Sequence, residues 1–269
     1  MINRHINSWL YFRATFNPME NRYSRNRIYM TKKEQKQIKD FPILLGGCGI
    51  GSVIAECALR FGFENITVVD GDQVEMSNLN RQNYTEQNIS ESKALAVEKR
   101  LKHINQKAKI VAVDDFLDKE NLKHHLQGKR VAINALDFSS DVPLHFDRVC
   151  QEQNIPVLHP YNLGWAGLLL VIHPKGLSLE SIQKNVGDFN EVDVVRYASE
   201  QMKFCRKPEP WIDEVIEKYQ VEKKALPPPQ LAVGSWILAS MTTHVLFNIA
   251  AGKRYKTFPE FYLSSLMND

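Results

Sequence analysis

Hydrophobic residues along the chain form short uninterrupted runs that alternate with longer amphipathic stretches. The short runs predict buried strands, because strands covered on both faces of a parallel sheet are apolar at consecutive positions. They cover residues 43–45, 65–70, 108–113, 130–136, 156–159 and 168–173. The amphipathic stretches predict helices at residues 31–39, 52–61, 90–103, 116–127 and 142–153. This alternation predicts an α/β protein with a doubly wound, mainly parallel sheet and helices on both faces.

The pattern loosens after residue 174. Charged stretches at 188–196 and 213–223, punctuated by prolines, predict a loop-rich insert or lid with one or two helices. Residues 231–252 carry no charged side chain and are long enough to span a bilayer, but their serines, threonines, histidine and asparagine favour a core or interface helix. A final strand is expected at 257–266. The chain is therefore expected to have four regions: an arm with a short helix (1–40), a Rossmann-like core (41–174), the insert (175–229) and a return to the core (230–269).

A glycine-rich turn, Gly46-Gly-Cys-Gly-Ile-Gly51, follows the first strand directly and opens the next helix. Glycines there permit a tight turn and a close approach of backbone N–H groups to a phosphate at the helix N-terminus. Asp70 ends the second strand about 20 residues later, where an acid can accept hydrogen bonds from ribose hydroxyls. Gly47, Gly49, Gly51 and Asp70 therefore predict a nucleotide site. The alternative is a tight turn without a ligand.

The segment after Asp70 distinguishes between nucleotides. Residues 72–82 are polar without a helical period, and they end on Arg81-Gln82; Lys93 follows at the next helix. Two cations near the phosphates suit a triphosphate better than a nicotinamide dinucleotide. Asp137 follows the fourth strand, at the sheet edge where ligands bind. Alternatively, Lys93 is a surface lysine and Asp137 caps the next helix.

Charge and cysteines narrow the classes of function. The net charge of +3 and the lack of a basic run with interleaved aromatics do not favour nucleic-acid binding. The four cysteines (Cys48, Cys57, Cys150 and Cys205) form no CxxC pair, which argues against a disulfide framework and fits a cytoplasmic protein. The first residues contain no uninterrupted apolar run, so no signal peptide is expected.

The order and spacing of several of these motifs resemble those of the ubiquitin-activating-type adenylyltransferases, the ThiF/MoeB/HesA family. The resemblance covers roughly residues 22–174, and the acid followed by S-N-L-x-R-Q is its most specific part. The matching pieces are Arg22-Tyr-Ser-Arg25, the glycine turn, Asp70-Gly-Asp72, Ser77-Asn-Leu-Asn-Arg-Gln82, Lys93 and Asp137.

The resemblance implies binding of ATP and Mg²⁺, and activation of a protein C-terminal carboxylate as an acyl-adenylate with release of pyrophosphate. Asp137 would hold Mg²⁺, and Asp70 and Asp72 would bind the nucleotide. Arg81 and Lys93, together with Asn78 and Gln82, would contact phosphates. The arginine that matches Arg25 reaches the neighbouring subunit's ATP in the family, which implies a homodimer; a solvated surface position is the alternative. A small ubiquitin-like or sulfur-carrier protein is the expected partner.

The sequence departs from the family at three points. Cys48 stands where the common turn has a glycine, and we interpret it as a small buried residue. The paired CxxC motifs of several members are absent, so no structural zinc is expected. Cys205 is the only cysteine of the insert, where related enzymes carry a thioester or persulfide cysteine, and its basic neighbours could lower its pKa. The alternative is a surface thiol.

Three other hypotheses stay open at this stage. One is adenylation of a small-molecule or tRNA-borne carboxylate, as in tRNA-modifying relatives. Another is a nucleotide-binding scaffold without catalysis, which the intact Arg81, Lys93 and Asp137 disfavour. The last is a NAD-dependent oxidoreductase, which the S-N-L-N-R-Q segment disfavours.

Overall fold

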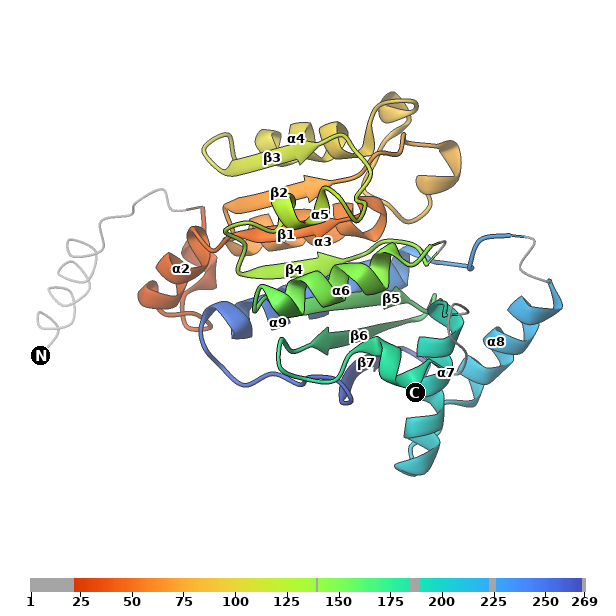
Figure 1. Ribbon diagram of the computed structural model, residues 1–269. Coiled ribbons are helices and arrows are strands. Elements are labelled where there is room, and N and C mark those ends of the chain that lie inside the picture. Colours follow the sequence, from red (N-terminus) through yellow and green to blue (C-terminus); the bar gives the residue numbers. More distant parts are fainter. Residues whose placement is uncertain (1–21, 139, 184–188, 223–225, 268–269) are drawn as a thin grey trace, which may run out of the picture.

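The computed structural model describes residues 22–138, 140–183, 189–222 and 226–267, so most of the expected N-terminal arm lies outside the described residues. Its centre is a seven-stranded sheet of order β3-β2-β1-β4-β5-β6-β7 (Figure 1). The strands are β1 (Ile43–Gly46), β2 (Asn65–Val69), β3 (Lys109–Val113), β4 (Val131–Asn134), β5 (Val157–Asn162), β6 (Ala166–Ile172) and β7 (Phe261–Ser265). The first five in the sheet pair in parallel, whereas β6 and β7 pair antiparallel. The predicted fold class is confirmed.

The strand order reverses direction beside β1. The chain runs outward from β1 to β2 and β3, then returns to the other side of β1 to form β4. In open α/β sheets, ligands bind at the carboxyl ends of the strands where the order reverses. The ends of β1, β2 and β4 therefore mark the expected site.

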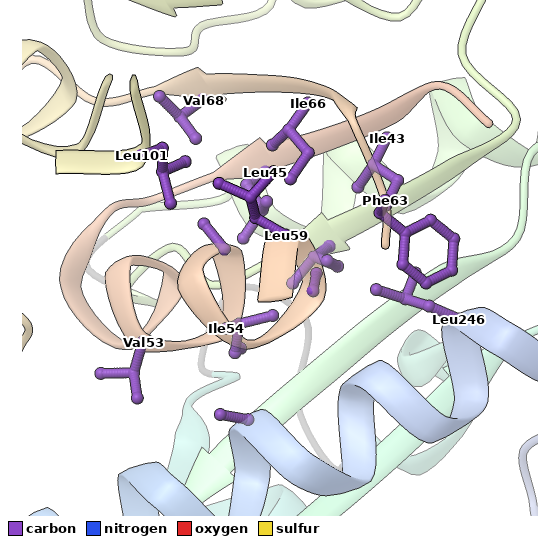
Figure 2. Packing of buried hydrophobic residues seen from close by; sticks show 14 of the residues in the cluster. Ile43, Leu45, Val53, Ile54, Leu59, Phe63, Ile66, Val68, Leu101 and Leu246 are labelled. Atoms are coloured by element: carbon purple, nitrogen blue, oxygen red, sulfur yellow. The ribbon is translucent and has the colours of Figure 1, made fainter. Parts of the chain in front are cut away.

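Helices cover both faces of the sheet, and alternate residues of each strand point to opposite faces. Ile43 and Leu45 pack with α3 (Gly49–Phe61), α4 (Lys93–Ile104) and α9 (Ala232–Ala250), as Figure 2 shows in part. Leu44 faces the other way and packs with α5 (Leu122–His125), α6 (Val142–Glu152) and α7 (Glu191–Phe204). The unbroken apolar run of β1 is thus explained by two separate cores.

Helix α9 is the uncharged stretch noted in the sequence. It is long and apolar enough to cross a bilayer by length and composition alone. In the fold it packs against α3, β5 and β6, and Leu238, Ala239 and Leu246 are fully buried. Its apolar composition therefore matches that of a core helix.

One predicted helix is wrong in extent. Residues 116–127 contain only the single helical turn α5, because side chains near residue 118 form hydrogen bonds with backbone groups there. The Asp118 Oδ1 atom accepts from the amides of Glu120 and Asn121, and the Asn121 side chain donates to the carbonyl of Phe116. Aspartate and asparagine stabilise turns in this way at the expense of helix.

The remaining helices follow their sequence signals. Helix α2 (Lys32–Lys39) begins with the predicted capping box, in which Thr31 Oγ1 accepts from the Glu34 amide at 3.2 Å. Among its described residues the insert contains the α-helices α7 and α8 (Pro210–Val221), where the sequence predicted one or two helices. Figure 1 shows this pair at one end of the molecule, beyond β6 and β7.

Candidate functional site

A cavity of about 1020 Å³ lies at the carboxyl ends of β1, β2, β4 and β5. We call the part lined by residues 47–93 and 134–138 the glycine-turn side, and the part lined by residues 191–195, 211–219 and 226–230 the insert side. Most predicted site residues line the glycine-turn side: Gly47, Gly49, Asp70, Asp72, Asn78, Arg81, Gln82, Lys93 and Asp137. Gly51, Arg25 and Cys205 are not among the lining residues.

The glycine turn is packed between the ends of two strands. The Gly47 amide donates to the Val69 carbonyl at 2.9 Å, and its φ is +91°, which side chains rarely adopt. A Cβ atom at Gly47 would lie 2.4 Å from the Ala135 carbonyl oxygen. Gly51 has another role: a Cβ atom there would lie 3.2 Å from Leu45, so its small size allows α3 to pack on the sheet. Gly49 and Ile50, the first residues of α3, line the cavity.

Cys48 is fully buried in the core beneath the turn. Its φ of −99° is ordinary for any residue, so no glycine is required there. Burial raises the pKa of its thiol well above the usual value, and the nearby Asp70 charge raises this pKa further. A neutral buried thiol is a poor nucleophile. Cys48 is therefore the small packing residue that the sequence suggested.

Asp70 and Asp72 organise the wall beside the turn. The two carboxylate oxygens of Asp70 accept from the amides of Cys48 at 2.5 Å and Asp72 at 2.8 Å. Burial raises the Asp70 pKa, and these hydrogen bonds oppose the rise. The Asp72 carboxylate forms a 2.9 Å ion pair with the Lys93 ammonium. The backbone amide of Lys93 also donates to the Asp72 carbonyl. Lys93 is thus a buried cation with a fixed position, not a surface lysine.

Arg81 is held from two directions. Its Nε atom donates to Gln230 Oε1 at 2.6 Å, and its Nη1 atom donates to the Ser77 carbonyl at 2.8 Å. Burial lowers the Arg81 pKa, an effect that the charge of Asp137 opposes, and an arginine remains protonated at neutral pH. Gln230 belongs to the insert side, and its contact with Arg81 spans 149 residues of chain. Nothing in the local sequence pattern indicates that pairing.

Asn78 and Gln82 differ in their roles. The Asn78 side chain accepts from the Glu75 amide at 3.0 Å and so shapes the turn that precedes Arg81. Gln82 Nε2 lies near Gly49, and its Oε1 atom is buried without a hydrogen-bond partner among the described residues. Buried polar atoms are rarely left unpaired, so Gln82 is the better candidate for a ligand contact.

Asp137 follows β4 on the cavity wall. Burial raises its pKa, and Glu191, Asp72 and Asp70 raise it further, whereas Lys93 lowers it. Within the described chain, no three histidine, cysteine or acidic side chains form a metal site by themselves. Mg²⁺ commonly takes one or two protein carboxylates and completes its shell with phosphate oxygens and water, so a single well-placed Asp137 fits this ion.

Two residues that the sequence analysis missed support the position of Asp137. Glu191, at the start of α7, accepts from the Phe138 amide at 2.9 Å. Asn134, the last residue of β4, donates to the Pro143 carbonyl at 2.9 Å and to the buried Asp147 carboxylate at 3.2 Å. These contacts hold the chain on either side of Asp137. Asn134 bonds to α6, the next helix along the chain, whereas Glu191 comes from an element 53 residues away from Phe138.

Arg25 and Cys205 lie on the surface outside the cavity. Arg25 is exposed in a short 3₁₀ helix, two residues before the exposed Arg27. Cys205 is exposed at the end of α7, whereas Glu191 at the start of the same helix reaches the cavity. Fourteen helical residues separate them by roughly 21 Å. Within one copy of the chain, neither residue is brought to the cavity.

The chain is similar to known proteins in sequence and in fold. It is 28% identical over 162 residues to a sulfur carrier protein ThiS adenylyltransferase of Bacillus subtilis (58% of this chain, 48% of that protein). It is 29% identical over 164 residues to a tRNA threonylcarbamoyladenosine dehydratase of Escherichia coli (60% and 59%). The chain thus spans about half the length of these curated relatives. The crystal structure of E. coli MccB with MccA matches with a TM-score of 0.68 at 17% identity (92% and 72%), which shows a shared fold.

A family model settles the classification. The ThiF family model matches residues 23–262, from the segment around Arg25 to β7. The match therefore includes the glycine turn, the Arg81 and Lys93 pair, Asp137 and both helices of the insert. The chain belongs to the ThiF family.

Proposed function

We propose that this protein is an ATP-dependent adenylyltransferase that activates a carboxylate. A carboxylate oxygen of the substrate forms a bond to the α-phosphorus of ATP. The bond from that phosphorus to the bridging oxygen of the β-phosphate breaks, and pyrophosphate leaves with the electron pair. The products are an acyl-adenylate and pyrophosphate, and no proton has to move. Such a reaction depends on alignment and on charge stabilisation more than on acid–base catalysis.

The arrangement of Arg81, Lys93 and Asp137 around the glycine turn carries this proposal. The two cations are the only Lys, Arg or His side chains among the described residues that line the cavity. Both are positioned by protein contacts, so little reorganisation is needed to face phosphates. Asp137 would hold Mg²⁺, which when bound neutralises phosphate charge. Asp70 offers its remaining lone pairs to ribose hydroxyls, and Phe116 exposes an apolar ring beside Gly71 where a base can pack.

We infer that the substrate is the C-terminal carboxylate of a small carrier protein or a peptide. Relatives named for ThiS adenylation and SUMO activation support a protein substrate, and the MccB structure with MccA belongs to the same fold group. The cavity also continues past the glycine turn to the insert side, which leaves room for a second ligand.

A second candidate, a tRNA-borne carboxylate, is favoured by one observation. Two relatives are named tRNA threonylcarbamoyladenosine dehydratase. Binding of a nucleic acid depends on several cations that neutralise phosphates. Arg81 and Lys93 are already engaged near the expected ATP phosphates, and in the described part of the cavity wall no other cation accompanies them. We therefore rank the tRNA substrate second.

We also propose a homodimer in which Arg25 approaches the partner's nucleotide. The segment after Arg25 presents the nearly fully exposed side chains of Ile28 and Tyr29. Ile28 adopts a φ of 79°, which a β-branched residue rarely does without a compensating contact. Mixing Arg25→Ala protein with Asp137→Asn protein would restore one intact site per mixed dimer. Recovery of exchange on mixing supports the shared site, whereas no recovery contradicts it.

Pyrophosphate exchange into ATP tests the central proposal. Carrier proteins and peptides with free C-termini should stimulate exchange in the wild-type protein. Asp137→Asn should lower exchange by about 100-fold or more, the usual loss when one charge-stabilising group is removed. Asp141→Asn is the matched control, because Asp141 lies four residues later, is exposed and pairs with Lys119 outside the cavity. Tight NAD binding without ATP binding would contradict the proposal.

A further inference from the structure

One face of α8 forms a wall of the insert side. Apolar side chains recur at a helical spacing on this face and line the cavity. They belong to Trp211, Ile212, Val215, Ile216 and Tyr219. The charged residues of the helix lie elsewhere; Asp213, for example, pairs with Lys203 of α7 at 2.7 Å. Val215 keeps 40% of its surface exposed although it lines the cavity. The wall therefore offers apolar surface that a ligand could cover.

Residues 226–230, Leu-Pro-Pro-Pro-Gln, form a strap along the same side of the cavity. Asn80 donates to the Gln230 carbonyl at 3.2 Å, and Arg81 donates to the Gln230 side chain. Asn162, at the end of β5, donates to the Leu231 carbonyl at 2.9 Å. The strap is thus tied to two walls at its C-terminal end. Its leucine, 62% exposed, and its prolines add to the apolar lining.

Charge on the insert side is sparse. Glu191 is the only ionisable acid or base that the described residues of this side present to the cavity, apart from the tyrosine hydroxyl of Tyr219. Glu191 already accepts from the Phe138 amide. An acidic side chain of a substrate would meet this carboxylate, and the one cation at the strap among the described residues, Arg81, already donates to Gln230. A glycine tail would leave the wall of α8 uncovered.

We propose that the insert side binds the terminal residue of the acyl substrate and selects a large apolar side chain, such as leucine, isoleucine or phenylalanine. This inference rests on the proposed function. The substrate carboxylate then lies between the two sides of the cavity, next to the α-phosphate, and the terminal side chain packs on α8 and the strap. The occupant is the C-terminus of a peptide or small protein with an apolar last residue, in contrast to a Gly-Gly tail.

Pyrophosphate exchange with three matched peptides tests the selection. The peptides share one sequence and end in leucine, glycine or glutamate. Burial of a leucine side chain contributes about 1.5–3 kcal/mol, so kcat/KM should be roughly 10- to 100-fold higher for leucine than for glycine. The glutamate peptide should be the poorest substrate. Equal rates for leucine and glycine would overturn the selection while leaving the proposed function intact. No exchange with these peptides or with Gly-Gly carrier proteins would overturn the proposed function itself.

A variant of α8 tests the location. Val215→Asp places a carboxylate on the wall, so the KM for the leucine peptide should rise at least about tenfold while the KM for ATP stays constant. Val221→Asp is the control, because Val221 lies on the same helix, is 80% exposed and does not line the cavity. An unchanged peptide KM in Val215→Asp, or an equal rise in Val221→Asp, would place the terminal residue elsewhere. Thermal unfolding of both variants verifies that they are folded.

Discussion

The two sides of the cavity differ in how their segments are joined. On the glycine-turn side, residues 47–93 follow β1 in one continuous stretch that contains α3, β2 and the start of α4, and residues 134–138 join them from the end of β4. The insert side combines residues 191–195, 211–219 and 226–230, and its contacts to the other side, such as Arg81 to Gln230, join distant segments. Most of the glycine-turn side is thus one continuous segment, whereas the opposite wall depends on how the insert folds back.

The largest effect should come from Gly47→Ala, which tests the rigidity of the glycine-turn side. An alanine at this position has to keep the φ of +91°, which side chains rarely adopt, and its methyl carbon would lie 2.4 Å from the Ala135 carbonyl oxygen. Strain and overpacking together should lower the free energy of unfolding by about 3 kcal/mol or more. Urea denaturation measures the change.

Gly128→Ala provides the comparison for this variant. Gly128 also has a positive φ, of +72°, but a Cβ atom there meets no atom within 4 Å. Gly128→Ala should therefore lower the free energy of unfolding by only about 1–2 kcal/mol, the cost of placing an alanine at a positive φ. Equal losses in the two glycine variants would show that the contact with Ala135 is not what restricts the turn.

A smaller effect is expected when the strap is released. Gln230→Met keeps the size of the side chain but removes the oxygen that accepts from Arg81. A hydrogen bond to a charged group contributes about 1.5–3 kcal/mol, so the KM for the peptide should rise by roughly tenfold or more. The KM for ATP should change less, because the other hydrogen bonds of Arg81 remain. A larger change for ATP than for the peptide would show that the two sides of the cavity do not act separately.

The pH dependence of pyrophosphate exchange should show that Glu191 of the insert side changes the pKa of Asp137 on the glycine-turn side. Burial and the Glu191 charge raise the Asp137 pKa, so Asp137 loses its negative charge at a higher pH than an ordinary aspartate as the pH falls. Activity should therefore decline on the acid side above the usual range near pH 4. Glu191→Gln removes a neighbouring negative charge and should move this decline to lower pH. A move to higher pH would contradict the role assigned to Glu191.

The smallest effect should follow Cys205→Ser. Cys205 is exposed and lies roughly 21 Å along α7 from the cavity end of that helix. Exposed positions of this kind usually change stability and binding by less than about 0.5 kcal/mol, which corresponds to about a twofold change in rate. Pyrophosphate exchange should therefore persist. A loss of exchange would place Cys205 in the adenylation step, whereas transfer of the acyl group to the thiol is a separate measurement.

Much of the fold could be predicted because its signals are local. Apolar runs marked the buried strands, and the Thr31–Glu34 capping box marked the start of α2. The helix at residues 116–127 was predicted too long because its leucines gave a helical period while Asp118 and Asn121 captured the backbone in turns. Periodicity records which residues are apolar, but it does not record which polar side chains bind the main chain.

The sequence by itself predicted the glycine turn, Asp70, Lys93 and Asp137 from their positions beside strand and helix ends, and Arg81 from the polar segment after Asp70; the structure places all of them on the cavity wall. Tertiary structure alone decided that Asp72 pairs with Lys93, that Gln230 binds Arg81 and that Glu191 supports the loop of Asp137. It also decided that α8 forms the apolar wall. The physical reason is that backbone geometry is specified by neighbouring residues, whereas contacts across 21, 53 and 149 residues exist only after the sheet has brought their partners together.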